Sequence, residues 1–128
     1  MRLLLDTHAF LWWVLDDKHL TARARSQIAD EANTVYVSAA SAWEVTTKVR
    51  LGKLPRAEFL AQDFTKYVVE EGFLGFDITL KHGQRAGALP GPHRDPFDRM
   101  LIAQALADDL ALIANEEVFD TYGVTRIW

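Results

Sequence analysis

The sequence predicts an α/β fold of three layers, in which a central parallel sheet is flanked by helices. Short apolar or β-branched runs alternate along the chain with longer segments of helical periodicity. Strands that alternate with helices pair in parallel, because each helix returns the chain to the same end of the sheet. The length of 128 residues, with 49% hydrophobic and 25% charged residues, is typical of a globular domain. We therefore expect residues 1–128 to form a single domain.

The predicted strands are short and apolar. The first run ends at Leu5, immediately before the charged Asp6. The second combines β-branched and aromatic side chains from Thr34 to Val37, which is typical of a buried strand. We expect five strands, at residues 2–5, 34–37, 73–78, 110–114 and 124–128.

The predicted helices begin and end at recognisable residues. In the first helix, Phe10, Trp13 and Val14 recur at helical spacing before the charged residues 16–18. A later helix ends at Gly52, because glycine readily adopts the backbone conformation that follows a helix. Further helices are expected at residues 21–31, 38–51, 58–71 (after Pro55), 79–88 and 96–108.

Composition excludes several classes of protein. The chain has no cysteine, which rules out disulfides and thiolate metal sites. Its longest uncharged run, residues 32–43, is too short to span a bilayer, and Asp6 and His8 interrupt the apolar start too early for a signal peptide. We therefore expect a cytoplasmic protein without a membrane partner. The net charge of −4 argues weakly against nucleic acid, but it would become +1 without the five acids described next.

Five acids are expected at one edge of the sheet. Asp6 follows the first strand, Glu44 lies in the helix after the second, and Glu116 follows the fourth. Asp95 and Asp98 open the helix before that fourth strand. The carboxyl ends of parallel strands share one edge, and neighbouring carboxylates stay ionised together only when a cation neutralises them. Hard oxygen ligands suit Mg²⁺ or Mn²⁺, so the pattern predicts a metal site suited to phosphodiester hydrolysis.

Helix capping is the alternative interpretation of the same acids. Asp6 and Asp95 both stand where an N-cap residue is favoured. The spacing of Ser41 and Glu44 fits a capping box. If Ser38 is the true cap instead, Glu44 lies too far inside the helix to cap it, which would favour the metal site.

Four stretches spread over the whole chain carry motif residues. They are Leu4–His8, Ser38–Val45 with Gly52–Leu54, His93–Ala105, and Tyr122–Val124 with Ile127–Trp128. Together and in this order they resemble a PIN domain, and more narrowly the VapC-like toxins of bacterial toxin–antitoxin pairs. Any one stretch is a weak signal, whereas all four at this length are specific. The resemblance implies a PIN-like α/β fold around a parallel sheet.

The resemblance also implies a ribonuclease that depends on Mg²⁺ or Mn²⁺, forms a homodimer and is inhibited by a cognate antitoxin. Asp6, Glu44 and Asp98 match the acids that hold metal in this family. Asp95 belongs to the same motif and either contacts the metal or caps the helix. Glu116 stands in an Ala-Asn-Glu stretch where the family has Thr-x-Asp. Because Glu is longer and less rigid than Asp, the number of bound metal ions is open.

The implied reaction is hydrolysis of an RNA phosphodiester by a water that the metal makes nucleophilic. The catalytic residues would be the three matched acids, Asp6, Glu44 and Asp98, together with Glu116 at the position of the family's fourth acid. We expect the Thr7 hydroxyl to fix Asp6 or a metal-bound water, with a role at the helix N-terminus as the alternative.

Basic and aromatic side chains suggest where partners bind. Arg94 and Arg99 flank the acids and are expected to contact RNA phosphates, with a solvated helix face as the alternative. Trp12 and Trp13 are adjacent in one helix, so one of them is expected on the surface. His8 has no second histidine at zinc-site spacing, and we expect it to be buried and hydrogen bonded.

Two other functions fit part of the sequence. A phosphatase of the haloacid-dehalogenase kind also uses an Asp after its first strand, but it needs another Asp where this chain has His8. A catalytically degenerate PIN-like module would bind RNA or a partner protein without cleavage. The departure at Glu116 keeps this second alternative open.

Overall fold

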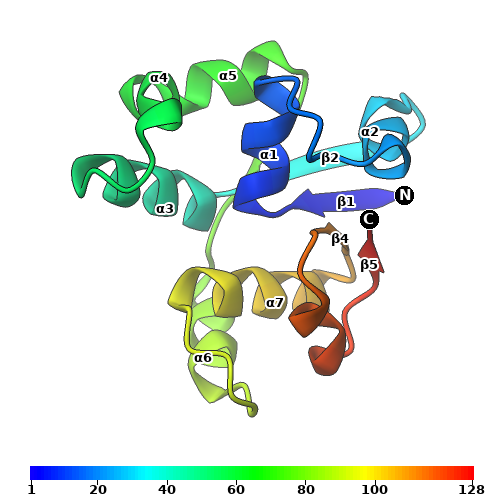
Figure 1. Ribbon diagram of the computed structural model, residues 1–128. Helices are drawn as coiled ribbons and strands as arrows, with labels where there is room; N and C mark the ends of the chain where they lie inside the picture. The colour runs from blue at the N-terminus through cyan, green and yellow to red at the C-terminus, as the bar shows by residue number, and fades with distance from the viewer.

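All five predicted strands are present in the computed structural model, which describes residues 1–128. They form one sheet in the order β3-β2-β1-β4-β5, and every neighbouring pair is parallel (Figure 1). The strands are β1 (Arg2–Leu5), β2 (Thr34–Ser38), β3 (Leu74–Phe76), β4 (Ala111–Ile113) and β5 (Arg126–Ile127). The sheet therefore confirms the predicted parallel α/β fold.

The helices agree with the prediction except between residues 58 and 71. There, Asp63 leaves the helical conformation and caps a second helix by accepting a hydrogen bond from the Lys66 backbone N–H at 3.2 Å. The predicted single helix is therefore wrong, and η2 was not foreseen. The helices are α1 (Thr7–Val14), α2 (Ala22–Ala29), α3 (Ala39–Arg50), η1 (Pro55–Ala57), α4 (Glu58–Gln62), α5 (Phe64–Glu70), α6 (Leu80–Ala88), α7 (Pro96–Asp108) and η2 (Glu117–Tyr122). None has the length and apolar character needed to cross a bilayer.

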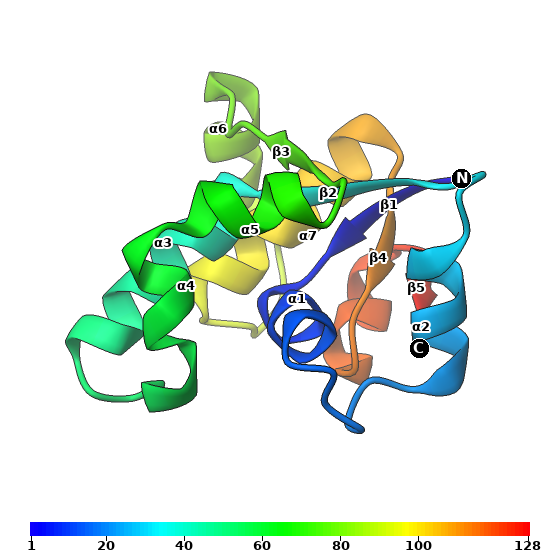
Figure 2. The same ribbon diagram turned by 90° about the horizontal axis from the view of Figure 1, so that it is seen from above.

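Both faces of the sheet are covered, so β1 alternates between two cores. Leu3 and Leu5 pack with Phe10 of α1 and with apolar residues of α2, α4 and α5. Leu4 faces the other way, against Leu101 of α7 and apolar residues of η2. Figure 1 shows α1, α4 and α5 above the strands with α6 and α7 below, and Figure 2 shows the strands beneath α1 and α5. The expected three layers are confirmed.

The carboxyl ends of β1 and β4 lie together at the centre of the sheet. β2 and β3 extend the sheet on one side of β1, and β4 and β5 extend it on the other. The Asp6 backbone N–H donates to the Ile113 carbonyl at 3.0 Å, which continues the pairing to the end of both strands. Open parallel sheets bind ligands at the carboxyl ends of the strands where the strand order reverses, and in this sheet that point lies at the paired strands β1 and β4.

Two expectations about aromatic and histidine side chains are wrong. Trp12 and Trp13 are both half-buried, and neither is exposed. The Trp12 ring stacks on the His19 ring, and Trp13 packs against the core that contains Phe10. The exposed tryptophan is Trp43, with an exposed fraction of 59%. His8 is half-buried and lies against the Trp12 ring at 5.5 Å, without a hydrogen bond to its imidazole.

Candidate active site

Asp6 is buried at the end of β1 and also caps α1. Its Oδ1 accepts a hydrogen bond from the Ala9 backbone N–H at 2.7 Å, and its exposed fraction is 5%. Burial raises the pKa of Asp6 to about 8, and the negative charges of Asp98, Glu116 and Glu44 act in the same direction. Asp6 therefore combines the capping role with a position among the other acids.

Glu44 does not cap a helix. Ser38 is the N-cap of α3, because its Oγ accepts the Ala40 backbone N–H at 3.0 Å. The capping-box interpretation of Glu44 is therefore wrong. Its buried carboxylate instead accepts a hydrogen bond from the Thr7 hydroxyl at 2.6 Å and pairs with the Lys48 ammonium. Two side chains thus hold the carboxylate in one orientation.

Thr7 links the first helix to the third. Its hydroxyl contacts Glu44 and is also hydrogen bonded to Ser41, with 3.0 Å between the two hydroxyl oxygens. All three residues are buried. The structure therefore places the Thr7 hydroxyl on Glu44, whereas the sequence suggested a contact with Asp6 or with a water.

Asp98 projects from the first turn of α7, and Asp95 caps the same helix. Asp95 Oδ1 accepts the backbone N–H groups of Phe97 at 2.9 Å and of Asp98 at 3.4 Å. Burial raises the pKa of Asp98 to about 6, opposed by the hydrogen bond from His93 and assisted by Asp95, Glu116 and Glu44. The capping alternative for Asp95 is thus present in the structure, with its charge close to Asp98.

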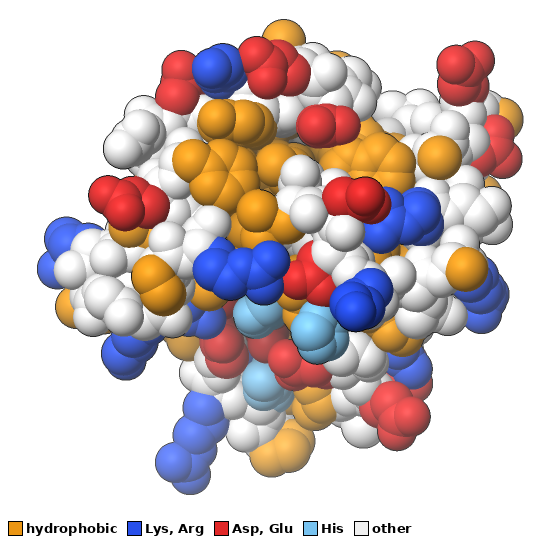
Figure 3. All heavy atoms as spheres, turned by 45° about the horizontal axis from the view of Figure 1, so that its top comes forward, with side chains coloured by type: hydrophobic (Ala, Val, Ile, Leu, Met, Phe, Trp, Pro, Cys, Tyr) orange, Lys and Arg blue, Asp and Glu red, His pale blue; other side chains and the backbone are white.

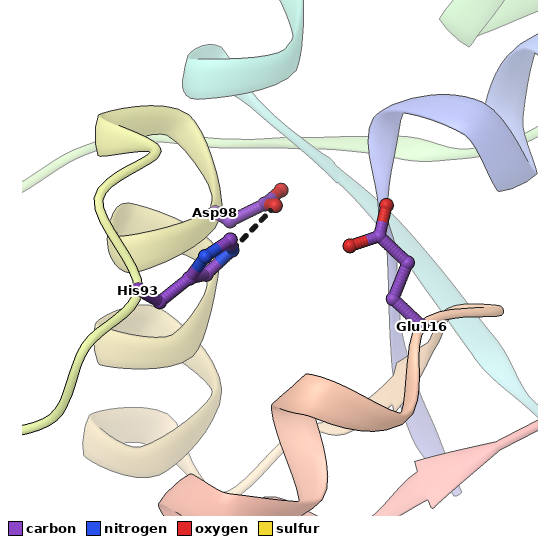
Figure 4. Close-up of side chains that lie close together, drawn as sticks. All are labelled: His93, Asp98 and Glu116. Atoms are coloured by element: carbon purple, nitrogen blue, oxygen red, sulfur yellow. Dashed lines mark hydrogen bonds and ion pairs between the residues drawn. The ribbon is translucent and has the colours of Figure 1, made fainter.

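His93, Asp98 and Glu116 form a compact group at the sheet edge. His93 Nε2 lies 2.8 Å from Asp98 Oδ2, and one ligand atom from each of the three residues lies within 4.8 Å of the others. Figure 4 shows the three side chains pointing toward a common space from the loop before α7, from α7 and from the segment after β4. His93 was not predicted to be a metal ligand, although it stands at the start of the motif that contains both aspartates.

The comparisons with known proteins agree with this architecture. The family model described as PIN domain matches residues 3–124. The chain belongs to the PIN-domain family. No curated protein matches it significantly.

Two solved structures have the same fold as this PIN domain. The VapBC2 structure from Rickettsia felis, bound to a DNA fragment from the promoter, has a TM-score of 0.70 and 17% identity, and the match covers 99% of this chain and 98% of that chain. VapC20 of Mycobacterium tuberculosis, a toxin that cleaves the sarcin–ricin loop, has a TM-score of 0.65 and 13% identity, with 95% of each chain covered. At these identities the similarity establishes the fold alone.

The two arginines of this PIN domain's central motif differ in their surroundings. Arg94 is exposed and makes no hydrogen bond or ion pair within the chain. The Arg99 guanidinium is held by backbone carbonyl groups at the end of α6 and in the loop that follows. They belong to Ala86 at 3.1 Å, Gly87 at 3.5 Å, Leu89 at 2.5 Å and His93 at 3.0 Å. These bonds give Arg99 a structural role, which sequence reasoning missed.

Aromatic side chains lie next to the acids of the PIN domain. Trp43 precedes Glu44 in α3, and its ring meets the Phe97 ring of α7 edge to face at 4.8 Å. The two rings line an open pocket whose other walls include Ile78 and Met100. Figure 3 shows acidic and histidine side chains gathered on one face of the molecule, with Lys and Arg side chains around them. Acids, cations and exposed aromatic rings thus occur close together.

Proposed function

We propose that this PIN domain is a metal-dependent endoribonuclease that acts as the toxin of a toxin–antitoxin pair. The observation that supports the proposal is that the charges of Glu44 and Glu116 act on both Asp6 and Asp98, although these acids come from distant segments of the chain. Burial is the main cause of the raised pKa of Asp6 and of Asp98, and the negative charges of the neighbouring acids raise both values further. Such shifts in a group of acids at a ligand-binding edge are typical of a functional site.

The donor set fits a hard divalent cation, Mg²⁺ or Mn²⁺. Oxygen donors alone come from Asp6, Glu44, Asp98 and Glu116, and no cysteine is present. In our proposal Asp6 and Asp98 are the main ligands, and Glu44 binds directly or through a water. Asp95 acts by its charge and by capping α7. When bound, the ion would lower the pKa of a coordinated water and offset charge on a phosphate.

Hydrogen bonds and an ion pair from neighbouring residues hold the Asp6 and Glu44 carboxylates in place. The Ala9 backbone N–H orients Asp6, and Thr7 with Lys48 orients Glu44. Water then attacks the phosphorus in line with the 3′-oxygen, and the bond from phosphorus to that oxygen breaks. The products are a 5′-phosphate and a 3′-hydroxyl, so the 2′-hydroxyl takes no part in the reaction.

The surroundings of the acids support RNA as the substrate. Arg94 has its donors free for a phosphate, and exposed aromatic faces such as Trp43 stack on unpaired bases. Proteins read RNA mostly through single-stranded segments whose bases are open to stacking. We therefore propose that the bases beside the cleaved bond stack on the pair of Trp43 and Phe97.

We further propose a homodimer and a cognate antitoxin as partners, with cleavage taking place in the cytoplasm. The similarity of fold to the Rickettsia felis VapBC2 structure supports an antitoxin partner. Copurification of the chain with the product of a neighbouring small gene would test it. A chain that stays active and uninhibited beside that product would contradict it.

Cleavage of a single-stranded RNA by the purified chain tests the central proposal. We expect cleavage in Mg²⁺ or Mn²⁺, complete loss with a chelator, and 5′-phosphate ends. Asp6→Asn and Asp98→Asn should abolish cleavage while the circular dichroism spectrum is retained. A 2′,3′-cyclic phosphate product, or cleavage that survives metal removal, would contradict the proposal.

The second candidate is a degenerate PIN-like module that binds RNA or a protein without cleavage. The presence of Glu116 where the family has Asp favours it. Calorimetric titration with Mg²⁺ or Mn²⁺ separates the two candidates. Saturable binding that is lost in Asp98→Asn supports the enzyme, and no binding supports the inert module.

A further inference from the structure

We propose that His93 supplies a nitrogen ligand to a second ion position, shared with Asp98 and Glu116, that prefers transition-metal ions such as Mn²⁺ to Mg²⁺. The inference rests on the proposed metal-dependent function and makes it more specific. In this proposal Asp98 takes part in two neighbouring sites. One is formed with Asp6 and Glu44, and the other, formed with His93 and Glu116, has nitrogen and oxygen ligands.

The positions of the three side chains suit one ion. An octahedral ion with ligands at about 2.1 Å holds adjacent ligand atoms about 3 Å apart and opposite ones about 4 Å apart. His93 Nε2 and Asp98 Oδ2 are separated by 2.8 Å, close to the adjacent spacing. One ligand atom from each of the three residues lies within 4.8 Å of the other two. A small movement of the exposed Glu116 side chain would therefore bring all three atoms to ligand distance from one ion. Figure 4 shows the Glu116 carboxylate facing the other two side chains.

The longer side chain of Glu116 matters for this arrangement. Glu116 lies three residues after the end of β4, and its carboxylate extends toward the loop before α7. That reach brings a Glu116 carboxylate oxygen within 4.8 Å of a His93 ring nitrogen and of an Asp98 oxygen. In this proposal the longer Glu116 side chain provides the reach that a site at His93 needs.

His93 is held where an ion could use it. Its backbone N–H donates to the Tyr122 hydroxyl at 3.1 Å, and its carbonyl accepts from Arg99 at 3.0 Å. Its ring meets the Phe119 ring edge to face at 6.3 Å, and the side chain is 18% exposed. These contacts come from η2 and α7, so the imidazole is positioned before any ligand binds.

An imidazole changes which ions the site prefers. Mg²⁺ binds oxygen donors almost exclusively, whereas divalent first-row transition ions also accept imidazole nitrogen. A position with one nitrogen and two carboxylates should therefore bind Mn²⁺ more tightly than Mg²⁺. The site of Asp6, Glu44 and Asp98, which offers oxygen alone, should discriminate less.

The test uses Mn²⁺ as the probe and compares the full chain with His93→Gln. The matched control is His19→Gln, because His19 Nδ1 is also hydrogen bonded to an aspartate, at 2.6 Å from Asp17 Oδ1. The His19 side chain is 70% exposed. In calorimetry we expect His93→Gln to weaken one Mn²⁺ site about tenfold or more while Mg²⁺ binding changes little. In pulsed electron paramagnetic resonance of bound Mn²⁺, we expect nitrogen coupling in the native chain and in His19→Gln, and none in His93→Gln.

Two results would overturn the inference. Saturable Mn²⁺ binding without nitrogen coupling in the native chain would mean that His93 only orients Asp98, although metal-dependent RNA cleavage still stands. Absence of any Mn²⁺ binding would contradict both the inference and the proposed function. The resonance signal does not depend on RNA, so a failure of His93 as a ligand is distinguishable from a failure of catalysis.

Discussion

The Thr7 hydroxyl donates a hydrogen bond to Glu44 Oε1 across 2.6 Å, and this bond ties the start of α1 to the second turn of α3. Thr7 directly follows Asp6, which lies at the end of the central strand. The position of the Glu44 carboxylate is thereby linked to the position of the Asp6 carboxylate. Both carboxylates are buried, and Glu44 is held in addition by its ion pair with Lys48.

Thr7→Val should therefore damage the site and lower stability. The valine leaves the buried Glu44 oxygen without its donor, which costs about 1–3 kcal/mol in the free energy of unfolding. Thr7→Ser keeps the hydroxyl and should retain most of the stability and activity. Urea unfolding and RNA cleavage of the two variants provide the measurement. Equal behaviour of valine and serine would show that the hydrogen bond is unimportant.

Asp6 should make the metal-free chain less stable as the pH rises. An unfolded Asp titrates near pH 4, whereas burial raises the pKa of Asp6 in the folded chain to about 8. Between these values the folded chain binds more protons, so its free energy of unfolding falls with rising pH. The stabilisation is complete below about pH 4 and is lost as the pH passes about 8.

Asp6→Asn removes this titrating group and should flatten the pH dependence. The part due to Asp98, whose pKa lies at about 6, has the same sign and should remain. Melting temperatures between pH 5 and pH 9 in a chelator measure both effects. Excess Mg²⁺ should reduce the slope in the native chain, because the ion binds ionised carboxylates. An unchanged pH dependence of the melting temperature in Asp6→Asn would contradict the raised pKa of Asp6 in the folded chain.

Glu116→Gln should reduce cleavage while the fold is kept. The amide retains the size of the side chain but loses the charge that the proposed metal site uses, and we expect a loss of about tenfold to a hundredfold. Glu117→Gln is the control, because Glu117 is its exposed neighbour and makes no hydrogen bond or ion pair through its side chain. Initial rates over a range of Mg²⁺ concentrations test this, and equal rates for the two variants would exclude Glu116.

Arg94 and Arg99 should differ in their effects on RNA binding and stability. Arg94→Gln removes a free cation, so RNA affinity should fall and the salt slope of binding should decrease by about 1. Its effect on the free energy of unfolding should stay within about 0.5 kcal/mol. Arg99→Gln loses donors to backbone carbonyls and should lower stability by about 1–3 kcal/mol. Binding at several salt concentrations, with thermal unfolding, distinguishes them.

Trp43 should contribute to RNA binding without affecting metal binding. Base stacking on an aromatic ring is worth about 1–3 kcal/mol, and Trp43→Leu should lose it while Trp43→Phe keeps much of it. Fluorescence anisotropy of a labelled RNA measures the affinity, and calorimetry with Mn²⁺ should give the same values for both variants. Tight RNA binding by Trp43→Leu would place the bases elsewhere.

Local features of the chain were sufficient to predict most of the fold. Alternating apolar runs located the five strands, and glycine and proline located helix ends such as Gly52. The break at Asp63 was missed even though its signal is local, since Asp is a favoured helix cap and accepts the Lys66 N–H. Asp6, Asp95, Asp98 and Glu116 each follow a strand or open a helix, and Glu44 lies in the helix after the second strand, a pattern that predicts one shared edge of a parallel sheet.

Contacts between distant segments decided the rest of the site. Thr7 meets Glu44 across 37 positions of the chain, and Glu116 faces His93 and Asp98 from the segment after β4. The orientation and neighbours of each side chain depend on how the helices pack over the sheet. The spacing of residues along the chain does not determine that packing. Strand and helix patterns reflect interactions among residues a few positions apart, so they can be read along the chain, whereas these pairings exist only after folding.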